Sequence, residues 1–180
     1  AFFVMLSEVL IYTPSIARFR LVYLEEQLAS AHLAALALQG APDRMVTEEL
    51  AEQLLTHAGA HSIVARKAGS NSQSIARPSG LKVDAEYDIR DHRVTALIFD
   101  ALNTLSQADN RVIRVIGQSP KDKSVLLAVV LDETPMRLAM YDYSWRILNL
   151  SVVISLVTAA LVFLSLRWLM VRPMQQITSS

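Results

Sequence analysis

The feature that most constrains this chain is residues 147–166, a run of twenty residues without a formal charge. As an α-helix the run would be about 30 Å long, which matches the hydrocarbon thickness of a lipid bilayer. Tyr141, Tyr143 and Trp145 precede it and Trp168 follows it, as aromatic residues do at membrane interfaces. The pattern predicts a transmembrane helix, and the alternative is a buried helix of a large soluble protein.

Residues 1–17 are also apolar, apart from Glu8 and a few hydroxyl side chains. Because a free-standing span needs about twenty residues, we predict the outer part of a first transmembrane helix, with a signal peptide as the competing interpretation. Arg167 and Arg172 follow the second span and place its C-terminal end in the cytoplasm. The segment between the spans is then extracytoplasmic, and we expect the protein to continue beyond both ends.

Composition limits the possible functions. Seventeen basic and seventeen acidic residues give a net charge of zero, which argues against nucleic acid as a partner, because such a surface needs a basic excess. The chain has no cysteine, which excludes disulfides and thiol catalysis. His57 and His61 have a spacing that could hold a metal on a helix, but Gly59 between them favours ordinary surface histidines. We predict no catalytic residue, metal site or cofactor in this part of the protein.

Residues 18–134 have the pattern of a small α+β domain, an antiparallel sheet with flanking helices, between the two transmembrane helices. In its first helix, apolar residues recur three and four apart, which is explained equally well by a parallel dimer and by packing on the domain's own core. This seam comprises Leu21, Leu24, Leu28, Ala31, Ala35 and Leu38.

Short strands and helices follow. A second helix is expected to be capped by Thr47 and to end at Gly59. The other predicted elements are strands at 62–66, 81–90, 111–117 and 124–131, a polar loop at 67–80, a helix at 94–105 and a turn at 119–122. The last two strands are close enough in sequence to form an antiparallel hairpin.

The end of the last strand is close to the start of the second membrane helix. Asp132 and Thr134 stand before Pro135, which is a favoured residue at the first helical position. No breaker follows, so a single helix is predicted over residues 135–170. The extracytoplasmic domain is therefore expected to be mechanically coupled to the membrane span.

Polar and small residues within the spans predict contacts between membrane helices. Glu8 is expected near the level of Asn149, Ser151 and Ser155, and a hydrogen bond from a protonated Glu8 is one hypothesis, with plain helix packing as the other. Ser151, Ser155 and Ala159 repeat every four residues, a spacing that allows close helix approach in lipid. These residues favour a dimer or four-helix interface.

The order of these elements resembles the N-terminal half of a bacterial membrane-bound sensor histidine kinase. Residues 171–178, VRPMQQIT, resemble the opening of a HAMP domain, in which Pro173 would begin a helix and Met174 and Ile177 would pack in a dimeric bundle. The stretch EVLIYTPSIARFR is similar to sensor kinases of alphaproteobacteria. The outer domain is similar in element order to PAS-like or Cache-like sensors.

The resemblance implies a homodimeric sensor module of a two-component system, located in the bacterial inner membrane with its sensor domain in the periplasm. It implies an unknown periplasmic ligand or partner protein and a cognate response regulator. Residues 171–180 would begin the HAMP linker, and ATP and magnesium would bind only a kinase core beyond Ser180. A chemoreceptor or a diguanylate cyclase could share this half. A membrane-anchored periplasmic scaffold without kinase output is an alternative of a different class.

Overall fold

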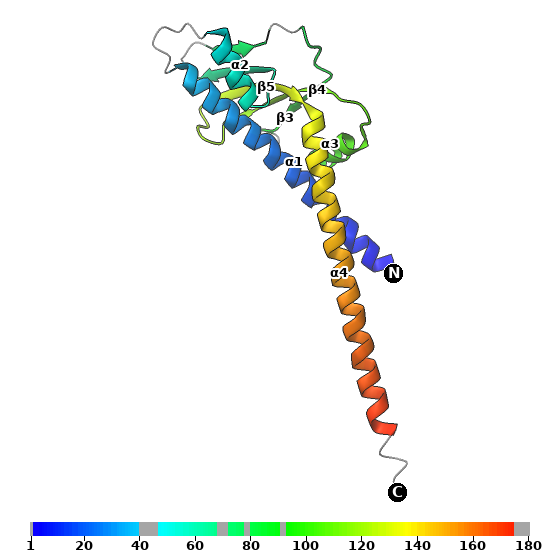
Figure 1. Cartoon of the computed structure of the whole chain (residues 1–180). Helices are drawn as coiled ribbons and strands as arrows, with labels where there is room; N and C mark the ends of the chain where they lie inside the picture. The colour runs from blue at the N-terminus through cyan, green and yellow to red at the C-terminus, as the bar shows by residue number, and fades with distance from the viewer. Residues whose placement is uncertain (1, 40–46, 68–71, 78–79, 91–92, 175–180) are drawn as a thin grey trace. The chain divides into compact units, whose positions relative to one another are not determined.

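The structure is a computed structural model that describes residues 2–39, 47–67, 72–77, 80–90 and 93–174. The chain divides into two compact units, Ala1–Met140 and Tyr141–Ser180. The first unit contains a sheet and helices that pack on it, and its order of helices and strands confirms the predicted α+β class (Figure 1). The elements are α1 (Phe2–Gln39), α2 (Glu48–His57), β1 (Ser62–Lys67), β2 (Gln73–Ala76), β3 (Ala85–Asp88), α3 (Val94–Ser106), β4 (Val112–Gln118), β5 (Val125–Asp132) and α4 (Glu133–Met174).

The five strands form one sheet in the order β2-β1-β5-β4-β3. Neighbouring strands are antiparallel except β3 and β4, which run parallel, with Ala85 opposite Ile113. A parallel pair cannot be joined by a tight turn, and here α3 makes the crossover between the two strands. The expectation of an antiparallel sheet is therefore wrong at this edge, and the sheet is mixed.

Two strand predictions near the sheet edges also need correction. β2 lies inside the predicted polar loop at 67–80, because its pairing with β1 outweighs a local sequence in which Ile75 is the only large apolar residue. β3 is shorter than the predicted strand at 81–90. Its partner β4 begins at Val112, opposite Asp84, so residues before Asp84 have no facing strand.

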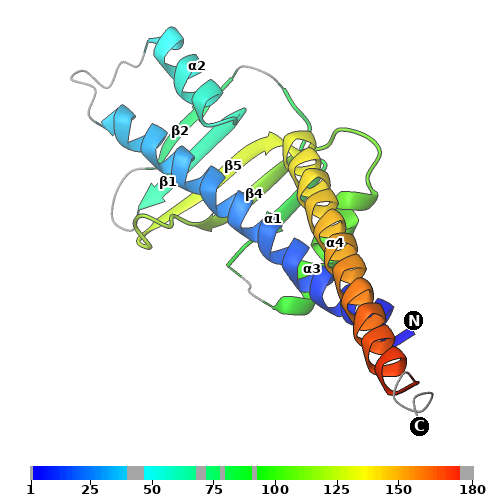
Figure 2. The same cartoon turned by 60° about the horizontal axis from the view of Figure 1, so that its bottom comes forward.

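Helix α1 lies across one face of the sheet (Figure 2). Leu24, Leu28, Ala31 and Ala35 of the predicted seam are all buried within this single chain. Of the two explanations for the seam, packing on the domain's own core therefore accounts for these four residues. The contact is close at Gly117 of β4, where a Cβ atom would lie 2.5 Å from Leu28 Cδ1.

Helix α2 has the predicted ends. The Thr47 hydroxyl accepts a hydrogen bond from the Leu50 N–H at 3.4 Å, which satisfies one of the free donors at the helix start. Gly59 follows the helix with a φ of 60°, in the left-handed region that glycine adopts without steric cost. Leu55 of the helix and Ala58, which caps its C-terminal end, are buried.

No loop separates the sheet from the last helix. β5 ends at Asp132 and α4 begins at Glu133, two residues earlier than the predicted helix start at Pro135. Met136 and Met140 are fully buried, so the first two turns of α4 belong to the core of the first unit. At the other end of that unit, Ile16 and Ala17 are buried, so core packing begins inside the segment predicted to end the first membrane helix.

Candidate functional site

A buried carboxylate stands at the first residue of α4. Glu133 is 1% exposed, and its side chain accepts two hydrogen bonds from Arg111, Nε to Oε2 at 2.6 Å and Nη2 to Oε1 at 2.9 Å. Arg111 immediately precedes β4, so this pair connects the start of the last helix to the start of a central strand. A fork-like arginine–carboxylate contact is both strong and geometrically specific.

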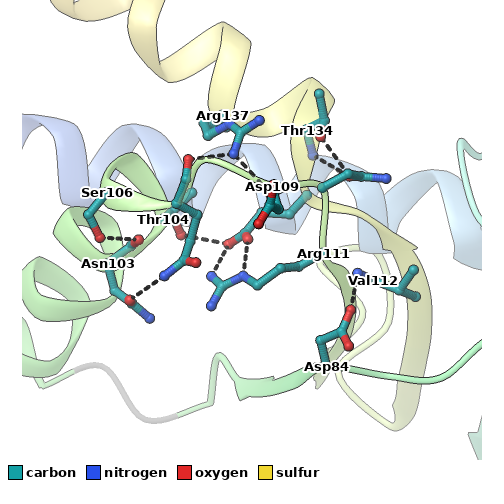
Figure 3. Close-up of polar contacts among 12 residues, drawn as sticks. Asp84, Asn103, Thr104, Ser106, Asp109, Arg111, Val112, Thr134 and Arg137 are labelled. Carbon is teal, nitrogen blue, oxygen red and sulfur yellow. Dashed lines mark hydrogen bonds and ion pairs between the residues drawn. The ribbon is translucent and has the colours of Figure 1, made fainter.

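Thr104 extends the pair to the other helices. Its hydroxyl donates to Glu133 Oε1 at 2.9 Å and accepts from Arg20 Nε at 3.1 Å. Thr104 is fully buried in α3, and Arg20 lies on the buried side of α1. Figure 3 shows that the side chains of Thr104 and Arg111 point toward each other from α3 and from the start of β4.

Arg20 is itself almost completely enclosed, with 1% of its surface exposed. Its guanidinium lies 4.3 Å from the centre of the Tyr87 ring of β3, and its Nη1 lies 3.9 Å from Asp100 Oδ2 of α3. Its Nη2 is buried and makes no hydrogen bond with the described residues. The group Arg20, Tyr87, Asp100, Thr104, Arg111 and Glu133 is called the junction network below.

The charges of the junction network compensate one another. Burial lowers the pKa of Arg20, because the charged form loses water, while Tyr87, Asp100 and Glu133 act in the opposite direction. The hydrogen bonds to Glu133 raise the pKa of Arg111. With two cations facing two carboxylates, the network tolerates burial only while every member is present. Removal of one partner from such a buried pair typically costs about 3–5 kcal/mol.

A second group of polar contacts holds the following turn of α4. Arg137 donates through Nη1 to the backbone oxygens of Gln107 and Asp109, at 2.5 and 3.0 Å, in the loop after α3 (Figure 3). The Thr134 hydroxyl donates to Asn110 Oδ1 at 2.6 Å. The first two turns of α4 are therefore attached to the α3–β4 loop as well as to the network.

Asp132 ties the same junction to the entry of β1, the strand next to β5. Its Oδ1 accepts from Asn110 Nδ2 at 3.2 Å, and its Oδ2 lies 2.9 Å from Nε2 of His61, at the entry to β1. His61 is thus paired with a carboxylate and is not on a helix with His57, since α2 ends at His57. Among the described residues, no group of three or more histidine, aspartate or glutamate side chains is arranged to hold a metal.

The residues predicted to make contacts in the membrane lie in different units. Glu8 is an exposed residue of α1 in the first unit. Asn149, Ser155 and Ala159 are exposed residues of α4 in the second unit, and Ser151 there is half-buried. Contacts between Glu8 and α4, and the small-residue interface, stay predictions.

The described residues contain one helix that is long and apolar enough to cross a membrane, Glu133–Trp168. No second such helix is found among them, so the predicted first span stays a prediction. The backbone of Pro173 and Met174 belongs to the last turn of α4, and Ile177 lies outside the described residues. The predicted HAMP start is therefore untested.

Sequence reasoning did not identify the junction network, although one signal was present. Ile16, Arg20, Leu24 and Leu28 recur every four residues, and a charged residue at a core position of such a stripe requires a buried partner. The partner could not be named, because Thr104 and Glu133 are 84 and 113 positions further along the chain. No family model matches the chain, and no curated protein or solved structure matches it significantly.

Proposed function

We propose that this chain is the sensor and transmembrane signalling module of a two-component sensor histidine kinase. In this proposal residues 18–134 form the periplasmic sensor domain, which responds to a ligand or partner protein. α4 crosses the inner membrane, and residues 171–180 begin the HAMP linker. The kinase core beyond Ser180 then phosphorylates a cognate response regulator, and the module acts as a homodimer.

The observation that carries the proposal is the position of Glu133. Glu133 is the first residue of the helix that contains the apolar run. Its carboxylate is also the most buried one among the described residues. Thr104 of α3 and Arg111 at the start of β4 bond it directly, and Arg20 of α1 is connected to it through Thr104. A change in the packing of any of these elements would alter the contacts of the first turn of α4. This is what a domain that transmits a signal through its exit helix requires.

Two further features support a membrane module. Leu6, Val9, Leu10 and Ile11 of α1 are exposed apolar residues, as expected for the outer part of a first span. The kinase output rests on the resemblance of residues 171–178 to a HAMP opening. A PAS-like or Cache-like identity of the domain rests on its element order.

The test uses the intact native polypeptide in lipid nanodiscs. Incubation with γ-labelled ATP and magnesium is expected to give an acid-labile phosphohistidine that passes to a response regulator. Glu133→Gln is expected to change the basal rate of phosphorylation, because it weakens the contacts of the first residue of α4 with Thr104 and Arg111. The matched control is Glu86→Gln, which removes an exposed ion pair with Arg114 (Nη1 to Oε2, 3.3 Å). Absence of phosphohistidine, or an equal effect of both variants, would overturn the proposal.

Topology is tested separately. The chain has no cysteine, so single cysteines introduced as Ser72→Cys and Ser179→Cys report without background. A membrane-impermeant maleimide is expected to label the first site in intact spheroplasts and the second only after lysis. Labelling of both sites before lysis would contradict the arrangement.

A further inference from the structure

Helix α3 has an outer face unlike that of a helix in water. Its thirteen residues contain one formally charged side chain, Asp100, and this carboxylate is turned toward the buried Arg20. The exposed residues of the helix include Phe99, Val94 and Leu102, which are 72%, 60% and 44% exposed. A surface helix in water normally carries charged residues on this side.

The contrast with α2 lies within the same unit. α2 is a surface helix with Leu55 buried, and it presents Glu48, Glu49 and Glu52 to solvent. α3 offers no charge at the equivalent positions. A general tendency of the domain toward apolar surfaces therefore does not explain the exposed face of α3.

The position of α3 indicates what covers this face. α3 packs against α1 next to Arg20, about 14 Å of helix rise from the exposed Ile11. Its C-terminal end is linked to the first residue of α4 through Thr104 and Glu133, and Figure 1 shows α3 beside the first turns of α4. Leu138, in those turns, is 60% exposed, and the uncharged run begins nine residues later in the sequence. α3 thus packs against α1 and is hydrogen-bonded to the first residue of α4, the helix that contains the uncharged run.

We propose that α3 is an interfacial helix whose outer face, formed by Val94, Phe99 and Leu102, inserts into the outer boundary of the lipid bilayer. The partner of this face is lipid, because its side chains are aromatic and aliphatic and carry no charge. Transfer of such side chains from water to the headgroup boundary is favourable. The inference rests on the membrane span of the proposed function. It adds a contact by which the bilayer surface itself holds Thr104, and through Thr104 the carboxylate of Glu133.

The test uses tryptophan fluorescence of the full chain in phosphatidylcholine–phosphatidylglycerol vesicles, with and without bromine on the acyl chains. Phe99→Trp is made in a chain carrying Trp145→Phe and Trp168→Phe, which removes both native tryptophans. The matched variant is Leu33→Trp, on an exposed face of α1 (58% exposed) thirteen residues from Arg20. Brominated lipid is expected to quench the tryptophan at position 99 and to leave that at position 33 unchanged.

The parent chain with Trp145 and Trp168 is the control for the span. If its fluorescence is quenched while the tryptophan at 99 is not, the interfacial helix is overturned and the proposed span stands. If the parent chain is not quenched, the span fails. Equal quenching at positions 33 and 99 would overturn a specific lipid contact. Efficient disulfide formation between two copies of a Phe99→Cys variant, without lipid quenching at 99, would assign this face to a second copy of the chain and also overturn the inference.

Discussion

Arg111 and Glu133 are directly opposite each other across the β4–β5 hairpin and are joined through both backbone and side chain. The Glu133 N–H donates to the Arg111 carbonyl at 2.9 Å, and the guanidinium holds the carboxylate through two further hydrogen bonds. The ladder that pairs Val112 with Asp132 thus extends one residue beyond the strands, into the first residue of a helix. The end of the sheet and the start of α4 are a single structural unit.

Replacing this carboxylate is the most direct test of the network. Glu133→Gln removes the anion that Arg111 holds and that Thr104 connects to the buried Arg20, and should lower the stability of the domain by about 3–5 kcal/mol. The measurement is hydrogen exchange of the β4 and β5 amides in the full chain in nanodiscs. Glu86→Gln, at an exposed pair, should cost less than about 1 kcal/mol. Equal losses would mean that the network does not stabilise the domain.

The hydroxyl of Thr104 can be removed with little change of shape. Thr104→Val removes one of the two hydrogen bonds to Glu133 Oε1 and leaves the Nε donor of Arg20 without this acceptor, and should destabilise by about 1–3 kcal/mol. Thr95→Val makes the same chemical change on the exposed side of α3 and should stay within about 0.5 kcal/mol of the parent. Thermal unfolding of the two variants in the same detergent provides the comparison. A larger loss for the exposed threonine would contradict the assignment.

Gly117 tests how closely α1 packs on the sheet. A Cβ atom there would lie 2.5 Å from Leu28 Cδ1 and 2.8 Å from Ile89 Cγ1, and both side chains are buried. Gly117→Ala should therefore destabilise by about 1–3 kcal/mol, since overpacked cores shift side chains and backbone. Gly80→Ala is the control, because a Cβ atom at Gly80 has no neighbour within 4 Å. Denaturant midpoints of the two variants should differ in this order.

The β4–β5 turn gives a pH-dependent prediction. Hydrogen bonds from the Ser124 hydroxyl (2.7 Å) and N–H (2.9 Å) lower the pKa of Asp122 from 3.8 to about 2. Because the folded-state pKa is depressed, the stabilisation is fully present above about pH 4 and is lost as the pH falls toward 2. Carboxyl NMR titration should show this midpoint. Ser124→Ala should move it back toward 3.8, and Ser106→Ala should leave it unchanged.

The position of the same turn explains why the network could not be predicted. A turn at 119–122 would not align Arg111 with Glu133. The Ser119 N–H donates to the Val125 carbonyl, so the connection extends to Ser124 and the register shifts accordingly. A small error in a turn moves every cross-strand pair, and strand boundaries are the least certain part of a sequence-based assignment.

Other features could be predicted from the sequence, because they are determined by residues that lie close together in the chain. Helix caps at Thr47 and Gly59, the amphipathic 94–105 helix and the final hairpin each follow from residues close in sequence. The parallel pairing of β3 with β4 and the edge strand β2 depend on which distant strand lies alongside. The heptad spacing of α1 was compatible with a parallel dimer and with packing on the domain's own core. The burial of Leu24 and Leu28 within the single chain favours the core.

The strand order has a consequence for how this protein is made. β5 is the last strand to leave the ribosome and the central one of the sheet, and it pairs with β1 on one side and β4 on the other. Until residues 125–132 are synthesised, β1 and β2 cannot join β3 and β4. The apolar run begins only fifteen residues after β5, so the segment that completes the sheet and the proposed membrane span are synthesised almost together. In the proposed membrane arrangement, completion of the sheet and insertion of α4 into the bilayer are therefore adjacent events in biosynthesis.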